Sequence, residues 1–194
     1  MNNMKRIILT TVTLVVLSAC SKYVQPSVLS EYEGTYEIES IIWRGSVDID
    51  INHDGVKEAD WISEFNGSPG YVKTWGKGEV FISSDNSLRI TSTIPIFVTT
   101  RLGDGIYTSG ICYYGLEHNA IYHQGGSVSP SFATNLFQAS NNEAVYGLND
   151  CGIFIAAKDT YELFAHCSII NPDDSSIIED TVHYTFKKIK PNNR

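Results

Sequence analysis

Oxygen-bearing side chains recur at alternate positions in residues 48–61, DIDINHDGVKEADW. Calcium binds six to eight oxygen atoms, and loops supply them by placing Asp or Asn at every second position, with a glycine where the chain turns sharply. This stretch follows that spacing, with Gly55 at position six of a loop that begins at Asp50. It predicts a calcium site whose ligands are Asp50, Asn52, Asp54, the backbone carbonyl of Val56 and Glu58.

The loop departs from the EF-hand pattern, and a simpler interpretation stays open. An EF-hand places a bidentate Glu at position twelve, where this sequence has Trp61, and Asp60 at position eleven is a further candidate ligand. The alternative is a polar turn at Asp54 and Gly55 with solvated carboxylates. Carboxylates this close repel one another, and a divalent cation removes that repulsion. We therefore expect an ion that holds the loop in shape and takes no part in catalysis.

The first 19 residues have the layout of an export signal. Lys5 and Arg6 precede an apolar run over 7–17 that is too short to span a bilayer. The run ends in Leu-Ser-Ala-Cys at 17–20, which resembles the lipobox of bacterial lipoproteins. The resemblance implies cleavage before Cys20 and attachment of several acyl chains there, which anchors the protein to a membrane. The alternative is an ordinary secreted protein with a chance cysteine at the cleavage site.

The residues after Cys20 bear on location and on the domain boundary. Ser21 and Lys22 follow it and no acidic run does, which resembles the sorting pattern of lipoproteins sent to the outer membrane. We expect the folded domain to face the periplasm, with exposure at the cell surface as the alternative. Residues 20–32 are interpreted as the lipidated N-terminus and a tether, and 33–190 as a single domain.

Charge limits the classes of partner. The chain carries 14 Lys and Arg against 22 Asp and Glu, and removal of residues 1–19 leaves 175 residues with a net charge of −10. No basic cluster interleaved with aromatic residues is present. Nucleic acid and an anionic lipid surface are therefore not expected partners, because both attract basic patches. A cation is the better match for so acidic a chain.

Alternation of apolar and polar residues predicts an all-β domain. In GTYEIESIIW, residues 34–43, Tyr36 and Ile38 share one face and glutamates share the other, which is the period of a half-buried strand. Turn signals recur about every ten residues, as in antiparallel sheets. A helix of two turns at most is predicted at 58–65, with Asp60 as its cap. Further strands are predicted at 78–84, 87–100, 110–117, 119–126, 143–148, 152–157, 160–170 and 179–190.

The order of these features resembles the lipocalin-like lipoproteins of Gram-negative bacteria. The shared features are the lipobox, a short tether, the GTYEIESIIW strand, the DIDINHDG…DWISEF insertion after it and the closing VHYTFKKIK strand. Gly34, Thr35 and Tyr36 stand where lipocalins often carry Gly-x-Trp, with tyrosine replacing the tryptophan. The resemblance implies an up-and-down antiparallel β-barrel whose mouth or interior holds a ligand. A β-sandwich is the alternative fold for the same strands.

Three cysteines remain once Cys20 carries lipid. Residues 158–160 are interpreted as a three-residue turn between two strands, which places Cys151 directly opposite Cys167. A turn one residue longer would put the two on opposite faces. In an oxidising compartment we therefore predict a Cys151–Cys167 disulfide, with Cys112 a free and buried thiol.

The sequence contains none of the common catalytic motifs. It has no GxSxG, HExxH, P-loop or GxGxxG pattern. His118 and His123 are spaced for neither a helical face nor one side of a strand, and the scattered His53, His166 and His183 are expected at the surface or at interfaces. Carboxylate pairs of the glycosidase type stay open, because their geometry is tertiary. We predict a protein without enzymatic activity.

Two functions follow from the predicted barrel. The first is binding of a small, partly apolar ligand in an interior walled by tyrosines, for which the candidates are Tyr36, Tyr113, Tyr122, Tyr161 and Tyr184. Ordinary core packing is the simpler role for each of them. The second function is display of loops, such as the polar segment 123–132, to an envelope protein or a glycan. An interior filled with large side chains would count against the first function and favour the second.

Overall fold

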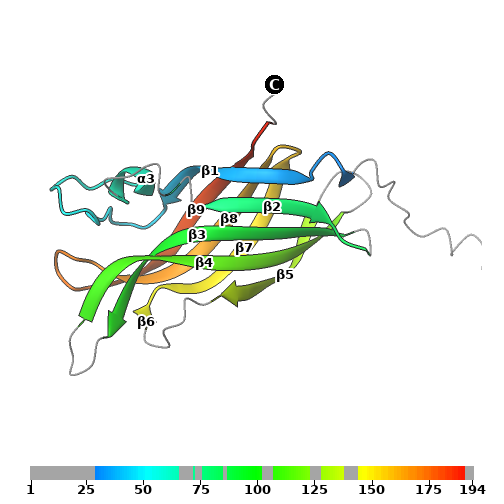
Figure 1. Cartoon of the computed structure of the whole chain (residues 1–194). Coiled ribbons are helices and arrows are strands. Elements are labelled where there is room, and N and C mark those ends of the chain that lie inside the picture. Colours follow the sequence, from blue (N-terminus) through cyan, green and yellow to red (C-terminus); the bar gives the residue numbers. More distant parts are fainter. Residues whose placement is uncertain are drawn as a thin grey trace, which may run out of the picture.

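The computed structural model describes residues 29–65, 72, 76–84, 87–101, 107–122, 128–137 and 144–190 (Figure 1). The side chains of 101, 107, 120–122, 128–137 and 144–146 are outside that description. The predicted signal peptide, Cys20 and residues 21–28 of the tether also lie outside the described residues. Within the described part, no helix is both long enough and apolar enough to cross a membrane.

Antiparallel strands make up most of the described chain. They are β1 (Gly34–Trp43), β2 (Lys77–Ile82), β3 (Leu88–Arg101), β4 (Tyr107–Tyr122), β5 (Val128–Phe137), β6 (Ala144–Tyr146), β7 (Leu148–Ala157), β8 (Thr160–Ile170) and β9 (Ile177–Lys188). Over the same residues there is one short helix, α3 (Trp61–Glu64). The predicted all-β class with a single short helix is confirmed.

The strands form one sheet that curls into a nearly closed barrel. Its order is β5-β4-β3-β2-β1-β9-β8-β7, with β6 pairing β3 off this path, and the pairings are antiparallel. Neighbours in the sheet are neighbours along the chain except at β1, which pairs with β9 and so joins the first strand to the last. β5 and β7 are the two edges and lie against each other at the seam. The predicted up-and-down barrel is therefore confirmed.

Alternating burial explains why these segments are strands and where the core lies. In β9, Val182, Tyr184 and Phe186 are fully buried while the residues between them are partly exposed. β8 has the same period, with Leu163 and Ala165 inside. One face of each strand thus points into the barrel, where apolar side chains from most strands form a single core. Burial of such a side chain contributes about 1.5–3 kcal/mol, so this core is the main source of stability.

The strand boundaries differ from expectation mainly in the middle of the chain. β1 and β8 have the predicted bounds. Residues 110–117 and 119–122 of the two predicted strands belong to one strand, β4, because the long β3 pairs with it from Tyr107 to Ala120, and 123–126 lie outside the described residues. β5 was not predicted: part of it falls in the supposed loop 123–132, yet it pairs with β4 across two register shifts. A bulge breaks the period of two and so hides a strand from pattern analysis.

β3 continues beyond the strand that pairs with it on one side. β2 pairs with β3 only as far as Ser92, so the residues of β3 after Ser92 are not paired with β2. Pro95 lies in this stretch, where its missing N–H removes no bond to β2. The hydroxyl of Tyr184 crosses the interior and donates to the Pro95 carbonyl at 2.6 Å. An interior tyrosine therefore satisfies a backbone group that the sheet leaves without a strand partner.

The segment after β1, which contains α3, lies at the left end of the barrel in Figure 1. The carboxylate of Asp60 accepts from the Ile62 N–H at 3.0 Å, which confirms the predicted cap. Trp61 stacks on Trp43 with ring centroids 5.0 Å apart, and both are buried. This stacking fixes the helix against the end of β1.

The folded domain begins earlier than predicted. Leu29 and Tyr32 are buried, and the hydroxyl of Tyr36 donates to the Tyr32 carbonyl at 2.6 Å. Residues 29–32 therefore belong to the domain, although the sequence analysis assigned them to the tether.

Candidate functional site

Aromatic side chains fill the interior around the start of β1 and β8. Tyr161 lies between Tyr36, at 5.1 Å between ring centroids, and Phe186, stacked at 4.6 Å. Gly78 makes room for this group, because a Cβ at that position would overlap the Tyr161 hydroxyl. We call the region of Tyr36, Gly78, Tyr161 and Phe186 the aromatic half of the barrel. It is occupied by packed side chains and is not an open binding chamber.

The buried tyrosine hydroxyls are bonded within the protein. Tyr161 shares a hydrogen bond with the Ser92 hydroxyl at 3.0 Å, and the single O–H of Tyr36 donates to the Tyr32 carbonyl at 2.6 Å, with the Lys158 carbonyl 3.2 Å away. Burial raises the pKa of Tyr36 to about 12 and also raises the pKa of Tyr161 and of Tyr184, so all three stay neutral. These three are core residues. Of the other predicted wall residues, Tyr113 is half-buried, and the side chain of Tyr122 lies outside the described residues.

A cleft of about 560 Å³ lies at the other end of the barrel, which we call the cap end. Four parts of the chain meet there: the Asp-rich loop 48–58, α3, the facing ends of β3 and β4, and the turn 171–176 after β8 (Figure 1). Its apolar lining includes Ile51, Phe65, Phe97 and Ile111, with Ile170 at the end of β8 and Pro172 in the turn that follows. Polar groups share the lining, among them Asn52, Ser109 and Asn171. Small-molecule sites have this size and this mixture.

The Asp-rich loop is shaped by its own side chains. The carboxylate of Asp50, which is 7% exposed, accepts from the N–H groups of Asp54 at 3.1 Å and Gly55 at 2.9 Å. The side-chain oxygen of Asn52, Oδ1, also accepts from the Asp54 N–H, and the Asp54 carboxylate accepts from the Val56 N–H. Gly55 has φ +89°, a conformation that favours glycine. Three of the predicted calcium ligands, Asp50, Asn52 and Asp54, therefore share one tight turn.

Glu64 of α3 holds the same loop from the inside. Its side chain is 2% exposed, and its carboxylate accepts from the N–H groups of Ile51 at 2.8 Å and Glu58 at 3.0 Å. Those donors lie on the two arms of the loop, so one carboxylate joins both. The sequence analysis missed Glu64. The available signal was an acidic residue between Trp61 and Phe65 on an apolar helix face, where a charge is buried only with partners.

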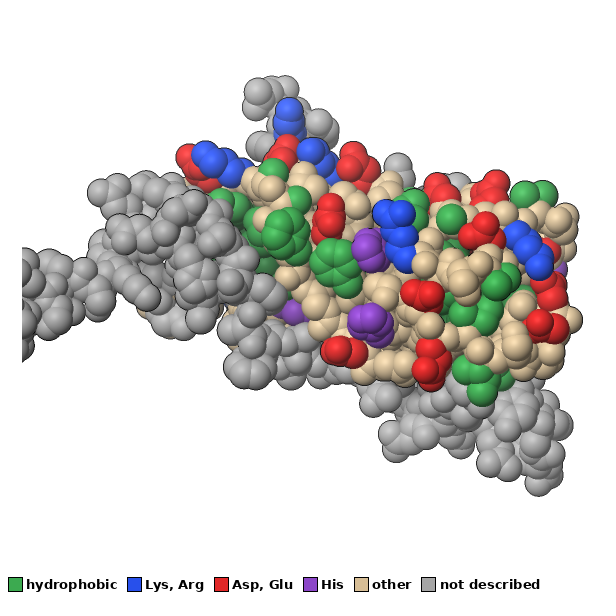
Figure 2. Space-filling model, turned by 180° about the vertical axis from the view of Figure 1, so that it is seen from behind, with side chains coloured by type: hydrophobic (Ala, Val, Ile, Leu, Met, Phe, Trp, Pro, Cys, Tyr) green, Lys and Arg blue, Asp and Glu red, His purple; other side chains and the backbone are tan. Residues whose placement is uncertain are grey.

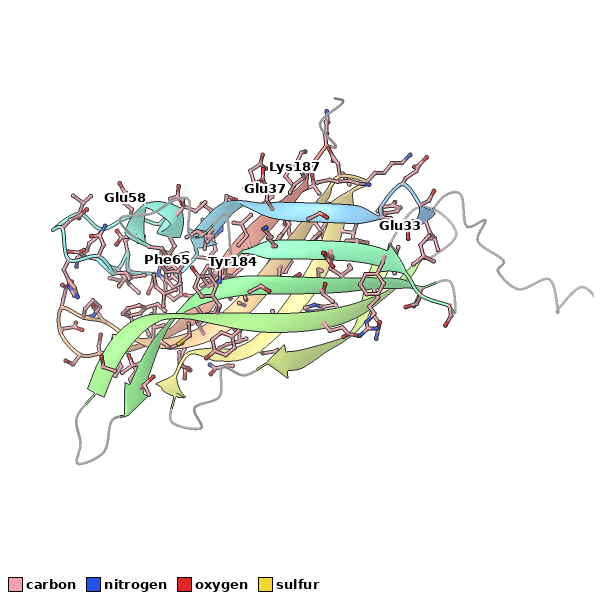
Figure 3. The ribbon with its side chains drawn as sticks, viewed as in Figure 1. Glu33, Glu37, Glu58, Phe65, Tyr184 and Lys187 are labelled. Atoms are coloured by element: carbon pink, nitrogen blue, oxygen red, sulfur yellow. The ribbon has the colours of Figure 1, made fainter. Side chains whose placement is uncertain are left out.

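Of the two remaining predicted ligands, the Val56 carbonyl and Glu58, the Glu58 side chain is engaged elsewhere. Its carboxylate accepts from the Ser63 hydroxyl, and Figure 3 shows Glu58 on the outer side of this segment while Phe65 faces the barrel. Among the described residues, no three His, Cys, Asp or Glu side chains gather closely enough to hold a metal ion. The carboxylate and amide oxygens of Asp50, Asn52 and Asp54 keep further lone pairs. The donor set on this turn therefore suits calcium in kind, with fewer side chains than the spacing predicts.

An ion pair joins the two segments that flank the cleft. Lys57 Nζ of the Asp-rich loop lies 2.6 Å from Asp173 Oδ2 in the turn after β8, and both side chains are nearly half exposed. The hydrogen bond to Asp173 raises the pKa of Lys57, and the nearby Asp174 and Asp50 raise it further. The pair therefore links the loop to the turn at the edge of the cleft.

His118, for which the sequence predicted no role, is buried in the barrel. It is 1% exposed, its Nδ1 has no partner in the described structure, and its Nε2 lies 3.8 Å from Cys151 Sγ. Burial lowers the pKa of His118 to about 4 and raises that of Cys151 to about 11. Both groups are neutral at pH 7, so they do not form the thiolate–imidazolium pair of a cysteine nucleophile.

The register of the β7–β8 hairpin differs from the prediction. Ala157 pairs with Thr160, so the turn contains two residues, and a register shift between Ile155 and Ala157 then places Cys151 opposite Ala165. Cys167 therefore lies two residues further along β8, and the predicted direct facing of Cys151 and Cys167 is wrong. In the structure both are free thiols, as is Cys112, and the predicted disulfide is absent. Diagonal cysteines are too far apart for a disulfide without backbone movement.

Comparison with known proteins identifies a lipid attachment site in the N-terminal segment. A family model of the prokaryotic membrane lipoprotein lipid attachment site matches residues 4–21, and no curated protein matches the chain. The match covers the predicted signal and Cys20, and it does not extend to the lipocalin resemblance. The chain is a bacterial membrane lipoprotein with a β-barrel fold, attached to its membrane by a lipid anchor.

Proposed function

We propose that this lipoprotein is a binding protein without enzymatic activity, and that a small, partly apolar molecule occupies the cleft at the cap end. The observation that carries the proposal is the cleft of about 560 Å³, which lies within the usual range for small-molecule sites. Phe65 and Phe97 give it apolar surface, and Asn52 and Asn171 give it groups that orient a ligand.

The contrast with the aromatic half supports this placement. The interior there is filled by Tyr36, Tyr161 and Phe186, which counts against the predicted ligand among the tyrosines, and the ligand is therefore proposed at the separate cleft. A site at the mouth of a barrel is common among proteins of this architecture.

The cleft can be tested with a matched pair of substitutions in the mature lipidated chain, held in nanodiscs. Ile111 lines the cleft and is 37% exposed, while Ile189, at the far end of β9, is 42% exposed. Ile111→Trp should fill the cleft, and Ile189→Trp should not. Naphthalene probes of positive, zero and negative charge are titrated calorimetrically, with empty nanodiscs as blanks.

Saturable binding of at least one probe, lost in Ile111→Trp and kept in Ile189→Trp, is the expected result. Absence of saturable binding by every probe, or equal binding by the two variants, would overturn the proposed function.

Calcium is proposed as a structural ion of the Asp-rich loop, held by Asp50, Asn52, Asp54 and the Val56 carbonyl, with Glu58 joining them if it leaves Ser63. An ion that binds only the native state raises stability, by about 2.7 kcal/mol at a hundred times its dissociation constant. Millimolar calcium should therefore raise the melting temperature, and Asp50→Asn with Asp54→Asn should abolish the rise. An unchanged melting temperature between calcium and chelator would exclude the ion.

Display to a partner is the second candidate function. A shallow depression of about 300 Å³ on β2, β3 and β4 is lined by Lys77, Glu79, Thr91, Thr93 and Gly115. These polar groups around a glycine suit a glycan or an envelope protein better than an apolar ligand. The predicted display loop 123–132 cannot carry this argument, since 123–127 lie outside the described residues and 128–132 are part of β5.

The outer membrane, with the domain facing the periplasm, is the proposed location. The support is Ser21 and Lys22 after the lipidated cysteine, in place of an acidic residue. Separation of inner and outer membranes by density gradient, followed by immunoblotting, tests it directly. Recovery with the inner membrane would overturn this location and leave the lipid anchor in place.

A further inference from the structure

Two of the four segments that form the cleft are strongly acidic. The segments 48–65 and 171–176, which form two of its sides, contain one lysine and no arginine. Their acidic residues are Asp48, Asp50, Asp54, Glu58, Asp60, Glu64, Asp173 and Asp174, most of them exposed. Figure 2 shows acidic side chains over this end of the molecule, at the right of the view. A bound calcium ion would offset two of these charges and leave the surroundings negative.

The one lysine of these segments is already engaged. Lys57 is paired with Asp173 and lies within the influence of Asp174 and Asp50. It therefore offers no free positive charge to an anionic ligand in the cleft.

Glu64 adds a negative charge in the cleft lining itself. It is among the lining residues, is almost fully buried, and its carboxylate is stabilised by backbone N–H groups. No Lys or Arg of the described residues forms an ion pair with it. A charge beside a hollow with apolar walls acts through a medium that screens it less than water does.

We propose that the molecule bound in the cleft carries a positive charge, as an organic ammonium group attached to an apolar body. The apolar body would contact Phe65, Phe97 and Ile111, and the ammonium group would lie toward Glu64 and the acidic rim. This inference rests on the proposed function and names the chemical class of its ligand. Charge complementarity of this kind selects among ligands of similar shape and speeds their association.

The test uses three probes that share a naphthalene body and differ in charge: 1-naphthylmethylamine, 1-naphthylmethanol and 1-naphthoate. Each is titrated calorimetrically into the mature lipidated chain in nanodiscs of zwitterionic lipid, at 20 and 300 mM salt. The ammonium probe should bind at least tenfold more tightly than the alcohol at low salt, and the carboxylate least tightly. The preference should shrink at high salt, because screening weakens exposed charges.

Two double variants with the same change in charge show where the preference arises. Asp173→Asn with Asp174→Asn neutralises the rim, and should lower the preference for the ammonium probe at least threefold. Glu37→Gln with Glu39→Gln changes two exposed residues of the barrel wall and should leave the preference unchanged.

The outcomes separate this inference from the proposal beneath it. Tight binding of the alcohol or the carboxylate, or equal preference in the two double variants, overturns the cationic ligand and keeps the cleft as a site. Absence of saturable binding by all three probes overturns the cleft itself.

Discussion

In the aromatic half of the barrel, the rings of Tyr36, Tyr161 and Phe186 pack against one another, and Gly78 leaves room for Tyr161 because it has no side chain. At the cap end, by contrast, the chain forms a cleft. The contacts differ in kind as well as in density. Aromatic packing holds the first region, while in the second the Trp43–Trp61 stack is joined by backbone N–H groups bonded to the carboxylates of Asp50 and Glu64.

The difference separates stability from binding within one sheet. Close packing around rings gives a large gain per residue and leaves no space for a ligand. Hydrogen bonds to carboxylates fix a loop without filling the volume beneath it, so a hollow survives next to an ordered loop. Substitutions should therefore act mainly on folding in the aromatic half and mainly on loop shape at the cap end.

The largest expected effect comes from adding one methyl group in each region. Gly78→Ala places a Cβ onto the Tyr161 hydroxyl, which is held by Ser92, and should lower the free energy of unfolding by about 3 kcal/mol or more. The Cβ added by Gly110→Ala at the cleft meets nothing within 4 Å, so this substitution should change the free energy of unfolding by less than about 1 kcal/mol. Urea denaturation monitored by tryptophan fluorescence measures both.

A similar loss of stability in both variants would contradict this contrast between the regions. Gly152→Ala is a further control, because it also lies in a strand and its added Cβ meets nothing within 4 Å.

The next effect concerns His118 in the interior. Its pKa is about 4 in the folded protein, against an ordinary value of 6.5, so between these pH values the unfolded chain binds a proton that the folded protein does not. Stability must therefore fall as pH falls through 6.5 toward 4, and His118 alone should account for about 2 kcal/mol between pH 7.5 and pH 5.

Urea denaturation at the two pH values measures that dependence. His118→Gln should remove the part of the pH dependence that His118 contributes. His53→Gln, in the exposed loop, should leave that part unchanged. An unchanged pH dependence in His118→Gln would show that the imidazole is solvated in the folded state.

Glu64→Gln probes the polar framework of the cap end. An amide cannot accept at both positions, so the N–H of Ile51 or Glu58 loses its partner, and we expect a loss of about 2 kcal/mol. Glu58→Gln, on the exposed side, should cost less than about 0.5 kcal/mol. Both are measured by urea denaturation in the presence of a chelator, so that no metal contributes. Equal effects would mean that Glu64 does not tie the two arms of the loop together.

The smallest effect is expected at the ion pair beside the cleft. Lys57→Met removes the partner of Asp173, and because both are exposed the melting temperature should change by about one degree at most. Scanning calorimetry at low and high salt measures it. A larger shift, absent at high salt, would show that the pair holds the loop against the turn.

Local sequence patterns determined much of the fold. The period of two placed β1 and β8 at their observed bounds, because alternation records which face of each strand is buried. Asp60 predicted the start of α3, because its carboxylate can accept a hydrogen bond from the first turn of a helix. The signal and Cys20 were likewise readable, since a processing site is recognised as a linear segment.

Other features depend on contacts between residues far apart in the sequence, and only the tertiary structure decided them. Whether Tyr36, Tyr161 and Tyr184 wall a cavity or fill it depends on four strands and on Gly78, which no local pattern joins. A two-residue turn together with a register shift between Ile155 and Ala157 placed Cys151 opposite Ala165. Glu64 meets the Asp-rich loop, and the cleft exists, only because separate segments converge at one end of the barrel. A sequence records the environment along the chain, and these features arise from packing across it.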